Sequence, residues 1–240
     1  MNKGTMTTTT IFSTALQEDM KLLIYTPADY TPMMTYPVAI ASDGNDYFQL
    51  GSLSRILDEK IEDGDIDEYL VVGIPYKNSE DRRQKYMPTG DKHPAYLQFL
   101  AEELIPYLEE NYSISPEPNE RILMGDSQAA TVSLLALIEY PEVFRQAILH
   151  SPQVTPEVLA LVKTLPEHID YSIYHAIGKG ETTVHTKDGQ VKDFLTPNRA
   201  LQNLLQQQEI DYDYNELPGD HTWKTWKPDL PNAIMRLFHK

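Results

Sequence analysis

The fold of this chain is decided by the stretch Glu120-Arg121-Ile122-Leu123-Met124-Gly125-Asp126-Ser127-Gln128-Ala129-Ala130, which the apolar run from Thr131 to Phe144 follows. A short hydrophobic segment reaches Gly125, turns sharply through Asp126-Ser127-Gln128 and continues with helical periodicity. This pattern predicts a nucleophile elbow, a strained strand-to-helix turn that exposes a serine hydroxyl beside the first helix amides. The usual form is Gly-x-Ser-x-Gly, and Ala129 replaces its last glycine. A serine at a helix start is more often only an N-cap, so the rest of the chain must decide.

Length and composition favour an ordinary globular protein of one domain. The 240 residues are 41% hydrophobic, which is enough for one sizeable core. A net charge of -16 repels nucleic acid and anionic membrane surfaces, so we expect neither as a partner. The chain has no cysteine, which excludes disulfides, thiolate metal sites and a cysteine nucleophile.

The N-terminal residues 1–10 contain four consecutive threonines and no apolar core, so we predict a flexible tail there and a single catalytic domain over residues 11–240. No segment has the length and apolar character of a signal peptide or a membrane span. A cytoplasmic location is therefore expected by default.

Apolar runs and helical spacings alternate along most of the chain. Strands are predicted at residues 11–15 and 20–25, forming a hairpin, and at 36–41, 69–74, 120–125, 146–150, 171–177 and 212–217. Helices are predicted at residues 50–61, 96–112 with a kink at Pro106, 128–144, 158–165, 195–208 and 223–238 with interruptions at Pro228 and Pro231. Residues 76–93 and 179–194 are expected to be polar loops. The alternation predicts an α/β fold with a mostly parallel sheet covered by helices on both faces.

Ligands of such sheets bind at the carboxyl ends of the strands, so residues that follow strands are the candidates for chemistry. Serine hydrolysis needs a nucleophile, a base, a carboxylate that orients the base, and amide donors for the oxyanion. Ser127, His221 and Glu181 follow three predicted strands in the order Ser, acid, His, which is the order of α/β-hydrolases. The amide after the serine, that of Gln128, and an amide of the Gly44-Asn45 turn are the predicted oxyanion donors.

Other histidines and carboxylates compete for these roles. His93, His168, His185 and His239 are expected at the surface, His175 in the core, and His150 too early in the chain to be the base, although it could reach the mouth of the site. Asp188 and Asp193 share the loop of Glu181 and stay open as alternatives for the acid. His185, Asp188 and Glu181 do not have the spacing of a regular metal site, so no metal is predicted.

Several motifs in the same order resemble the putative-esterase (esterase D) family, and most of all its enterochelin esterase branch. They are Gly125-Asp126-Ser127-Gln128-Ala129-Ala130, Glu139-Tyr140-Pro141-Glu142-Val143-Phe144, His150-Ser151-Pro152, Ser42-Asp43-Gly44, Gly178-Lys179-Gly180-Glu181 and Gly219-Asp220-His221-Thr222-Trp223. The resemblance runs from about Ile11 to Phe238. It implies an α/β-hydrolase fold without a large lid, and it carries Ser127, Glu181 and His221 over as the triad. Ala129 and Ala130 in place of family glycines leave the shape of the acyl pocket open.

These observations predict a serine carboxylesterase that acts on small acyl esters, sugar and aromatic esters included, without a cofactor. Siderophore-ester hydrolysis is the alternative, although a chain at -16 repels a polyanionic substrate unless local charge overrides it. A non-catalytic relative that binds a ligand in the same cleft is a third reading. If the protein is an enzyme, its binding partner is expected to be a small-molecule ester. Whether the protein forms a homo-oligomer stays open. Predicted substrate contacts are Arg83, Tyr86, Trp223 and His150.

Overall fold

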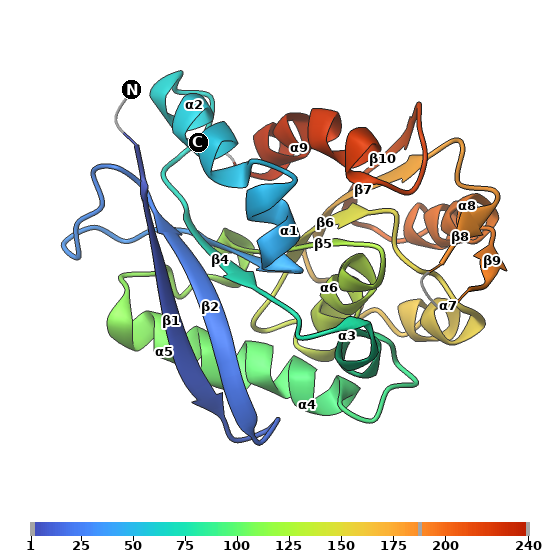
Figure 1. Ribbon diagram of the computed structural model, residues 1–240, viewed down its shortest axis with the longest axis horizontal. Helices are drawn as coiled ribbons and strands as arrows, with labels where there is room; N and C mark the ends of the chain where they lie inside the picture. The colour runs from blue at the N-terminus through green and yellow to red at the C-terminus, as the bar shows by residue number, and fades with distance from the viewer. Residues whose placement is uncertain (1–2, 187–188, 239–240) are drawn as a thin grey trace.

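The elbow stretch forms the middle of an eight-stranded sheet in the computed structural model, which describes residues 3–186 and 189–238 (Figure 1). The strand order across the sheet is β1-β2-β4-β3-β5-β6-β7-β10. All six residues of β5 are buried, as expected for a strand covered on both faces. The strands are β1 (Thr5–Ser13), β2 (Glu18–Thr26), β3 (Val38–Ser42), β4 (Leu70–Ile74), β5 (Arg121–Asp126), β6 (Gln146–His150), β7 (Ser172–Gly178) and β10 (Asp211–Leu217).

Strand direction follows the length of the connections. β1 and β2 form an antiparallel hairpin, and β2 also pairs antiparallel with β4. The other neighbours in the sheet are parallel. Parallel neighbours need a crossover connection, and helices form these connections here. The mostly parallel sheet and its N-terminal hairpin confirm the predicted fold class.

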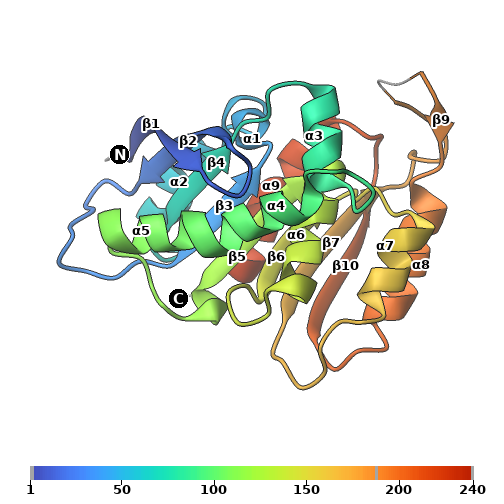
Figure 2. The ribbon, with the colours of Figure 1, turned by 90° about the horizontal axis from the view of Figure 1, so that it is seen from below.

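Helices cover both faces of the sheet (Figures 1 and 2). One face carries α1 (Gly44–Gln49), α2 (Leu53–Glu62) and α9 (Trp223–Leu237), and the other carries α4 (His93–Gln98), α5 (Ile105–Asn111), α6 (Gln128–Glu139), α7 (Pro156–Val162) and α8 (Leu195–Leu205). Successive residues of β5 alternate between the two cores, with Ile122 packing on the first face and Leu123 on the second. The sheet therefore fixes which side chains leave its carboxyl edge and in which direction.

The prediction of a flexible tail is wrong for Thr5 to Thr10, which belong to β1. The nine residues of β1 pair in continuous register with β2, from Thr5 opposite Thr26 to Ser13 opposite Glu18. Threonine favours extended backbone, and the ladder pairs those backbone amides and carbonyls of this edge strand that face β2, although few of its side chains are buried. Backbone pairing with β2 holds β1 in the sheet, and most of its side chains are exposed. The strand therefore needs no alternation of apolar and polar residues, which is the signal that a sequence prediction uses.

The predicted loop over residues 76–93 contains the helix α3 (Ser79–Tyr86) and the first residue of α4. The side chain of Asn78 caps α3 by accepting the Asp81 amide at 2.9 Å. Only Lys85 and Tyr86 of this helix are buried, so it lacks the apolar stripe that identifies an amphipathic helix. It packs beside α6, close to the elbow.

Prolines act differently from the sequence prediction in two places. The segment predicted as one kinked helix divides into α4, the π-helical turn η1 (Phe99–Leu104) and α5, in which Pro106 is the second residue. In contrast, α9 runs through Pro228 and Pro231 without interruption. Burial of Leu230, Ala233 and Ile234 from this helix offsets the lost amide donors.

Three short elements complete the fold: the 3-10 helix η2 (Pro118–Glu120) before β5, and the small antiparallel pair β8 (Val184–His185) and β9 (Val191–Lys192). The pair lies in the region predicted to be irregular. Within residues 3–186 and 189–238, no helix has the length and apolar character needed to cross a membrane.

A charged cluster fastens the N-terminal hairpin to α3 and α4. The carboxylate of Glu18 accepts hydrogen bonds from Lys77 at 2.8 Å, from Lys92 at 3.2 Å and from the buried Lys85. Asp81 also accepts from Lys85 and Lys92. Burial by itself would raise the pKa of Glu18, but the three lysines outweigh it and lower the pKa to about 2.

We expect Glu18→Gln to lower the free energy of unfolding at pH 7 by about 2 kcal/mol, because Lys85 loses a charged partner. A carboxylate with a lowered pKa stabilises the fold fully above its unfolded pKa, and this contribution disappears as the pH falls from about 4.5 to about 2. Urea unfolding should therefore show the two proteins converging in stability over that range. Glu110→Gln, at an exposed site of α5, is the control, and a difference that stays constant down to pH 2 would contradict the prediction.

Candidate active site

Ser127 stands on a strained turn between β5 and α6. Its backbone has φ 55° and ψ -120°, a conformation that non-glycine residues rarely adopt. Its amide donates to the carbonyl of His150 at 2.8 Å, which ties the turn to the end of β6. A side chain at Gly125 would overlap the backbone of Ala129, so the first glycine of the motif is required for the close approach of strand and helix. Ala129 itself is accommodated in the core without exposure.

The three residues predicted as a triad meet at the carboxyl edge of the sheet. Nε2 of His221 lies 2.9 Å from the hydroxyl oxygen of Ser127, and Nδ1 of His221 lies 2.6 Å from Oε2 of Glu181. A carboxylate at Nδ1 favours the tautomer in which Nδ1 carries the proton and Nε2 is free to accept one. This geometry permits proton transfer from Ser127 to His221.

Glu181 is completely buried, and its second oxygen is also satisfied. Oε1 accepts from the hydroxyl of Ser151 at 2.6 Å and from the amide of Gly178 at 2.8 Å. The indole of Trp226 donates to the same Ser151 hydroxyl at 2.9 Å. Ser151, itself held by Trp226, thus fixes the Glu181 carboxylate, a role that the sequence did not predict for either residue. The one signal for Ser151 is its place directly after a strand.

The imidazole of His221 is held between two aromatic rings. Its centroid lies 4.2 Å from that of Phe194 and 5.0 Å from that of Trp226, the latter edge-on. Its side chain is 14% exposed, so the ring is packed and still reachable from solvent. The preceding Gly219 has φ 138°, and a side chain there would strike Thr225.

The predicted oxyanion donors come from two adjacent helix N-termini. β3 and β5 are paired in the sheet, and they lead into α1 at Gly44 and α6 at Gln128. The first amides of a helix have no acceptor within that helix, so those of Gly44, Asn45 and Gln128 stay the candidate donors. Asp43, in the left-handed conformation at φ 61°, makes the turn into α1.

Arg82 of α3 connects these two turns and was not among the predicted site residues. Its Nε donates to the carboxylate of Asp43 at 2.7 Å, and its terminal nitrogens donate to the Asp126 carbonyl and to the Gln128 side chain. Burial raises the pKa of the Asp126 carboxyl well above its usual range, nearby Asp43 adds to this effect, and Arg82 opposes it. We therefore expect the Asp126 carboxyl to be protonated and neutral.

The four residues predicted to contact the substrate differ in their exposure to solvent. Arg83 pairs with Glu80 on the exposed side of α3. Tyr86 is buried, and its hydroxyl accepts from the Asp43 amide at 3.3 Å, so it lies under the turn and does not face a substrate. His150 is completely buried and pairs with Asp229 at 3.1 Å, which corrects its prediction as a substrate contact.

Trp223 is partly exposed. It is the first residue of α9, two positions after His221, and its ring meets that of Tyr47 edge-on at 4.9 Å. This position leaves its predicted contact with substrate as a proposal.

Of the two rival acids, the structure describes only Asp193. Its carboxylate accepts the Thr196 amide in the first turn of α8 at 3.1 Å, and hydrogen bonding from Thr196 lowers the pKa of this carboxyl. Asp188 lies outside the described residues.

The rival histidines are placed as follows. His168 and His185 are exposed as predicted, whereas His93 is buried with its ring nitrogen near the Lys85 carbonyl, because α4 turns it inward. His239 lies outside the described residues. His175 is a satisfied core residue, bonded to Tyr212 and Asn198, and burial lowers its pKa to about 4.

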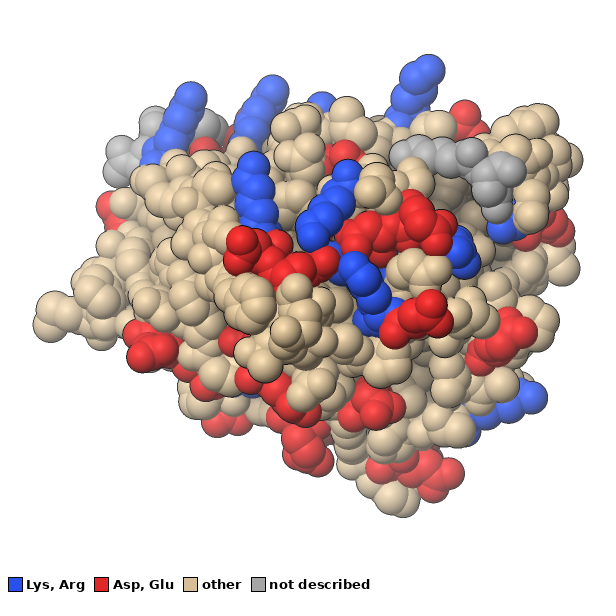
Figure 3. Space-filling view, turned by 60° about the horizontal axis from the view of Figure 1, so that its bottom comes forward, with Lys and Arg blue, Asp and Glu red and all other residues tan. Residues whose placement is uncertain are grey.

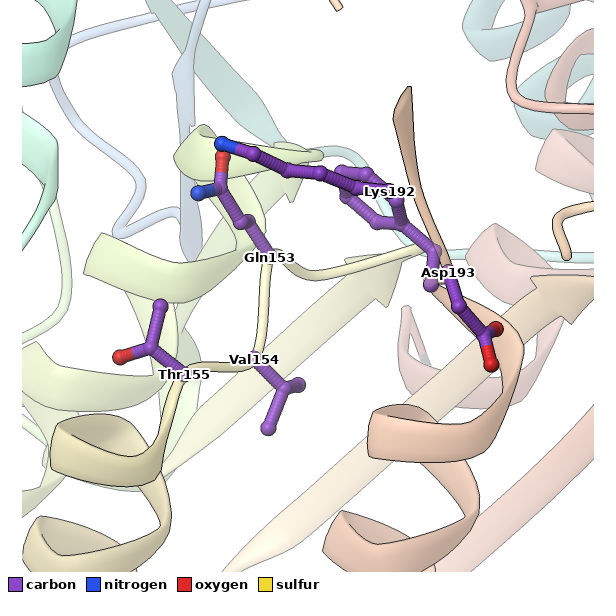
Figure 4. Close-up of a pocket in the computed structure, with 6 residues that line it drawn as sticks. Gln153, Val154, Thr155, Lys192 and Asp193 are labelled. Carbon is purple, nitrogen blue, oxygen red and sulfur yellow. The ribbon is translucent and has the colours of Figure 1, made fainter. Parts of the chain in front are cut away.

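A pocket of about 270 Å³ opens beside the triad between the segment after β6 and the segment before α8. Gln153 joins it to the elbow, because its amide donates to the Ser127 carbonyl and its side chain accepts from Gln128. Lys192 extends across the pocket toward Gln153, while Asp193 turns its carboxylate away (Figure 4). The pocket is lined by Gln153, Val154, Thr155, Lys192, Asp193 and Phe194.

The mostly parallel sheet, the strained serine turn and the order of Ser127, Glu181 and His221 along the chain define the class of protein as an α/β-hydrolase. No large lid interrupts the described residues. The chain belongs to the family described as "Putative esterase", whose model matches residues 13–237, and it is therefore an esterase of this fold.

A curated relative and two solved structures are similar to the chain over nearly its full length. The chain is 42% identical to the uncharacterized protein YjcH of Bacillus subtilis over 98% of both chains. A ferulic acid esterase from Anaeromyces mucronatus has a TM-score of 0.77 at 18% identity, covering 99% of this chain and 92% of that one. The enterobactin esterase FES of Shigella flexneri has a TM-score of 0.82 at 16% identity, covering 97% of this chain and 59% of that one. At these identities the two structures show likeness of fold.

We expect Glu181→Gln to lower kcat for a simple ester by roughly 10³- to 10⁴-fold, because an amide in place of the carboxylate no longer favours the reactive tautomer of His221. The matched control is Asp193→Asn, at the rival acid, since the asparagine side-chain oxygen can still accept the Thr196 amide. Steady-state rates on p-nitrophenyl acetate measure both variants. A loss of similar size in Asp193→Asn with little loss in Glu181→Gln would reverse the assignment of the acid.

Proposed function

We propose that this protein is a serine carboxylesterase that uses Ser127 as nucleophile, His221 as general base and acid, and Glu181 as the orienting carboxylate. The observation that supports it most directly is the continuous hydrogen-bonded chain from the Ser127 hydroxyl through His221 to a buried Glu181. Such a chain is what activation of a serine requires.

The proposed reaction has two steps. In the first, Nε2 of His221 takes the proton of Ser127 while the serine oxygen attacks the ester carbonyl carbon. The carbonyl oxygen becomes an oxyanion, which the amides of Gln128 and of the Gly44-Asn45 turn stabilise. The intermediate collapses to an acyl-enzyme, and the departing alcohol receives the proton from the His221 imidazolium.

In the second step a water molecule attacks the acyl-enzyme. His221 takes the water proton, the same amides hold the new oxyanion, and Ser127 recovers its proton as the carboxylic acid leaves. The positive charge that His221 carries in each step is stabilised by Glu181. The Ser127 proton leaves with the alcohol and a water proton replaces it, so Ser127 and His221 end in their starting protonation states and a cofactor is not needed.

The proposed substrates are small acyl esters, sugar and aromatic esters included. The pocket beside the triad, at about 270 Å³, suits a small group, and Phe194 and Trp223 offer aromatic surface near His221. The ferulic acid esterase neighbours point the same way as candidates for an aromatic acyl group.

Siderophore-ester hydrolysis is the second candidate, because enterobactin esterases share the fold. The charge of this chain argues against it, since -16 repels an iron-catecholate polyanion. In Figure 3 most visible lysines and arginines lie in the upper half of the molecule among acidic side chains, and acidic side chains are scattered over the lower half. On that face the basic residues form no broad cationic surface for such a ligand.

We expect the wild type to hydrolyse p-nitrophenyl acetate and butyrate, and Ser127→Ala to reduce the rate to near background, by roughly 10⁵-fold or more, because the nucleophile is gone. A fluorophosphonate probe followed by mass spectrometry should label Ser127 alone. Ser79→Ala, at an exposed serine of α3, is the control and should label normally. Equal rates in wild type and Ser127→Ala would refute the serine mechanism and favour a non-catalytic binding protein.

A substrate panel separates the remaining candidates. We expect acetylated sugars or feruloyl esters to give a higher kcat/KM than a catecholate trilactone, because electrostatic repulsion slows the encounter with a polyanion. Added salt should raise kcat/KM for the trilactone toward that of the neutral esters, since it screens this repulsion. A trilactone preference at low salt would instead favour the siderophore esterase.

A further inference from the structure

Arg82 uses all three nitrogens of its guanidinium within the site. Nε and one terminal nitrogen contact the Asp43 carboxylate, at 2.7 and 2.5 Å. The latter nitrogen also donates to the carbonyl of Asp126 at 3.0 Å, and the other terminal nitrogen donates to the side chain of Gln128 at 3.2 Å. A planar fork with fixed angles between its donors therefore joins two loops that are far apart in the sequence.

The first of these loops carries one half of the proposed oxyanion hole. Asp43 directly precedes Gly44 and Asn45, and its carbonyl accepts the amides of Asp46 and Tyr47. With its side chain held by Arg82, the left-handed residue at the turn has little freedom to rotate. The direction of the Gly44 and Asn45 amides is set by that residue.

The second loop carries the other half. Arg82 donates to the carbonyl of Asp126, the residue before Ser127, and to the side chain of Gln128, the residue after it. The backbone amide of Gln128 is the second proposed oxyanion donor. Contacts on both sides of Ser127 keep the strained elbow at a fixed distance from the Asp43 turn.

The ion pair of Arg82 and Asp43 is largely shielded from solvent. The Asp43 side chain is 1% exposed and that of Arg82 is 15% exposed. The rings of Tyr76 and Tyr86 each lie 5.6 Å from the centre of the guanidinium, so aromatic faces surround the cation. A buried ion pair adds little stability compared with apolar packing. We therefore attribute to the pair of Arg82 and Asp43 the role of holding the two loops in a fixed geometry.

We propose that Arg82 is a positioning residue that sets the spacing between the two amide donors of the oxyanion hole. The proposal rests on the serine esterase function proposed above. It does not require Arg82 to touch the substrate. The interaction with the oxyanion is stronger in the transition state than in the ground state, so its loss should lower kcat more than it changes KM.

The test compares Arg82→Gln and Arg82→Lys in the full chain, with p-nitrophenyl butyrate as the neutral substrate. Displacing one oxyanion donor costs about 10²- to 10³-fold, so we expect Arg82→Gln to lower kcat by about 10- to 100-fold with KM changed less than about threefold. Arg82→Lys keeps the charge beside Asp43 but not the planar fork, so kcat should fall to an intermediate value. Arg55→Gln, at an exposed arginine of α2 paired with Glu59, should leave the rate unchanged.

Two further measurements separate positioning from a general loss of structure. A trifluoromethyl ketone inhibitor, which forms an oxyanion on the serine, should bind less tightly to each variant in proportion to its loss of kcat/KM. Methylguanidinium added to folded Arg82→Ala should restore part of kcat. Circular dichroism and thermal unfolding identify the folded variants, and Arg82→Lys decides the question if the neutral variants do not fold.

The proposal is overturned if folded Arg82→Gln and Arg82→Lys keep kcat within about twofold of wild type. It is also overturned if the variants change only KM for anionic esters, which would make Arg82 a substrate contact. Both outcomes are distinct from failure of the esterase proposal, which would appear as full activity in Ser127→Ala.

Discussion

Parallel pairing of strands is the constraint on which the site depends, because it brings the carboxyl ends of β3, β5, β6, β7 and β10 to one edge of the sheet. Each of these ends is followed within four residues by a residue of the candidate site: Asp43, Ser127, Ser151, Glu181 and His221, in chain order. The pairing of the strands brings Ser127 and His221, 94 positions apart, within hydrogen-bond distance.

Around that edge, Glu181 and Asp43 each have charged or polar partners, whereas one carboxyl oxygen of Asp43 and one of Asp126 have no hydrogen-bond partner. Glu181 is surrounded by donors from Ser151, Gly178 and His221. Asp43 is paired with Arg82, and Asp126 is expected to avoid a second buried negative charge by staying protonated. A low-dielectric site strengthens these interactions and makes an unpaired charge costly, which explains why so many partners converge here.

Several elements could be predicted because their signal is local. The elbow, the apolar strands and the chain order of Ser127, Glu181 and His221 follow from periodicity and from residue types after strands. The choice among the seven histidines also followed from position along the chain, and the structure places His221 beside Ser127. Other predictions failed for physical reasons. β1 is held by backbone pairing and α3 by a polar cap, so neither has a strong hydrophobic pattern, and the burial of Tyr86 and His150 depends on elements distant in sequence.

The sequence by itself determined the α/β class and the candidate triad, because strand and helix periods and the order of reactive residues are properties of neighbouring positions. Only the tertiary structure decided that Glu181 and not Asp193 faces His221, that Ser151 and Trp226 hold the Glu181 carboxylate in place, and that Arg82 joins the turns at Asp43 and Asp126. Adjacent arginines on one helix point about 100° apart, so which of Arg82 and Arg83 reaches the site depends on how α3 is rotated against the sheet. Packing sets that rotation, and packing involves residues from the whole chain.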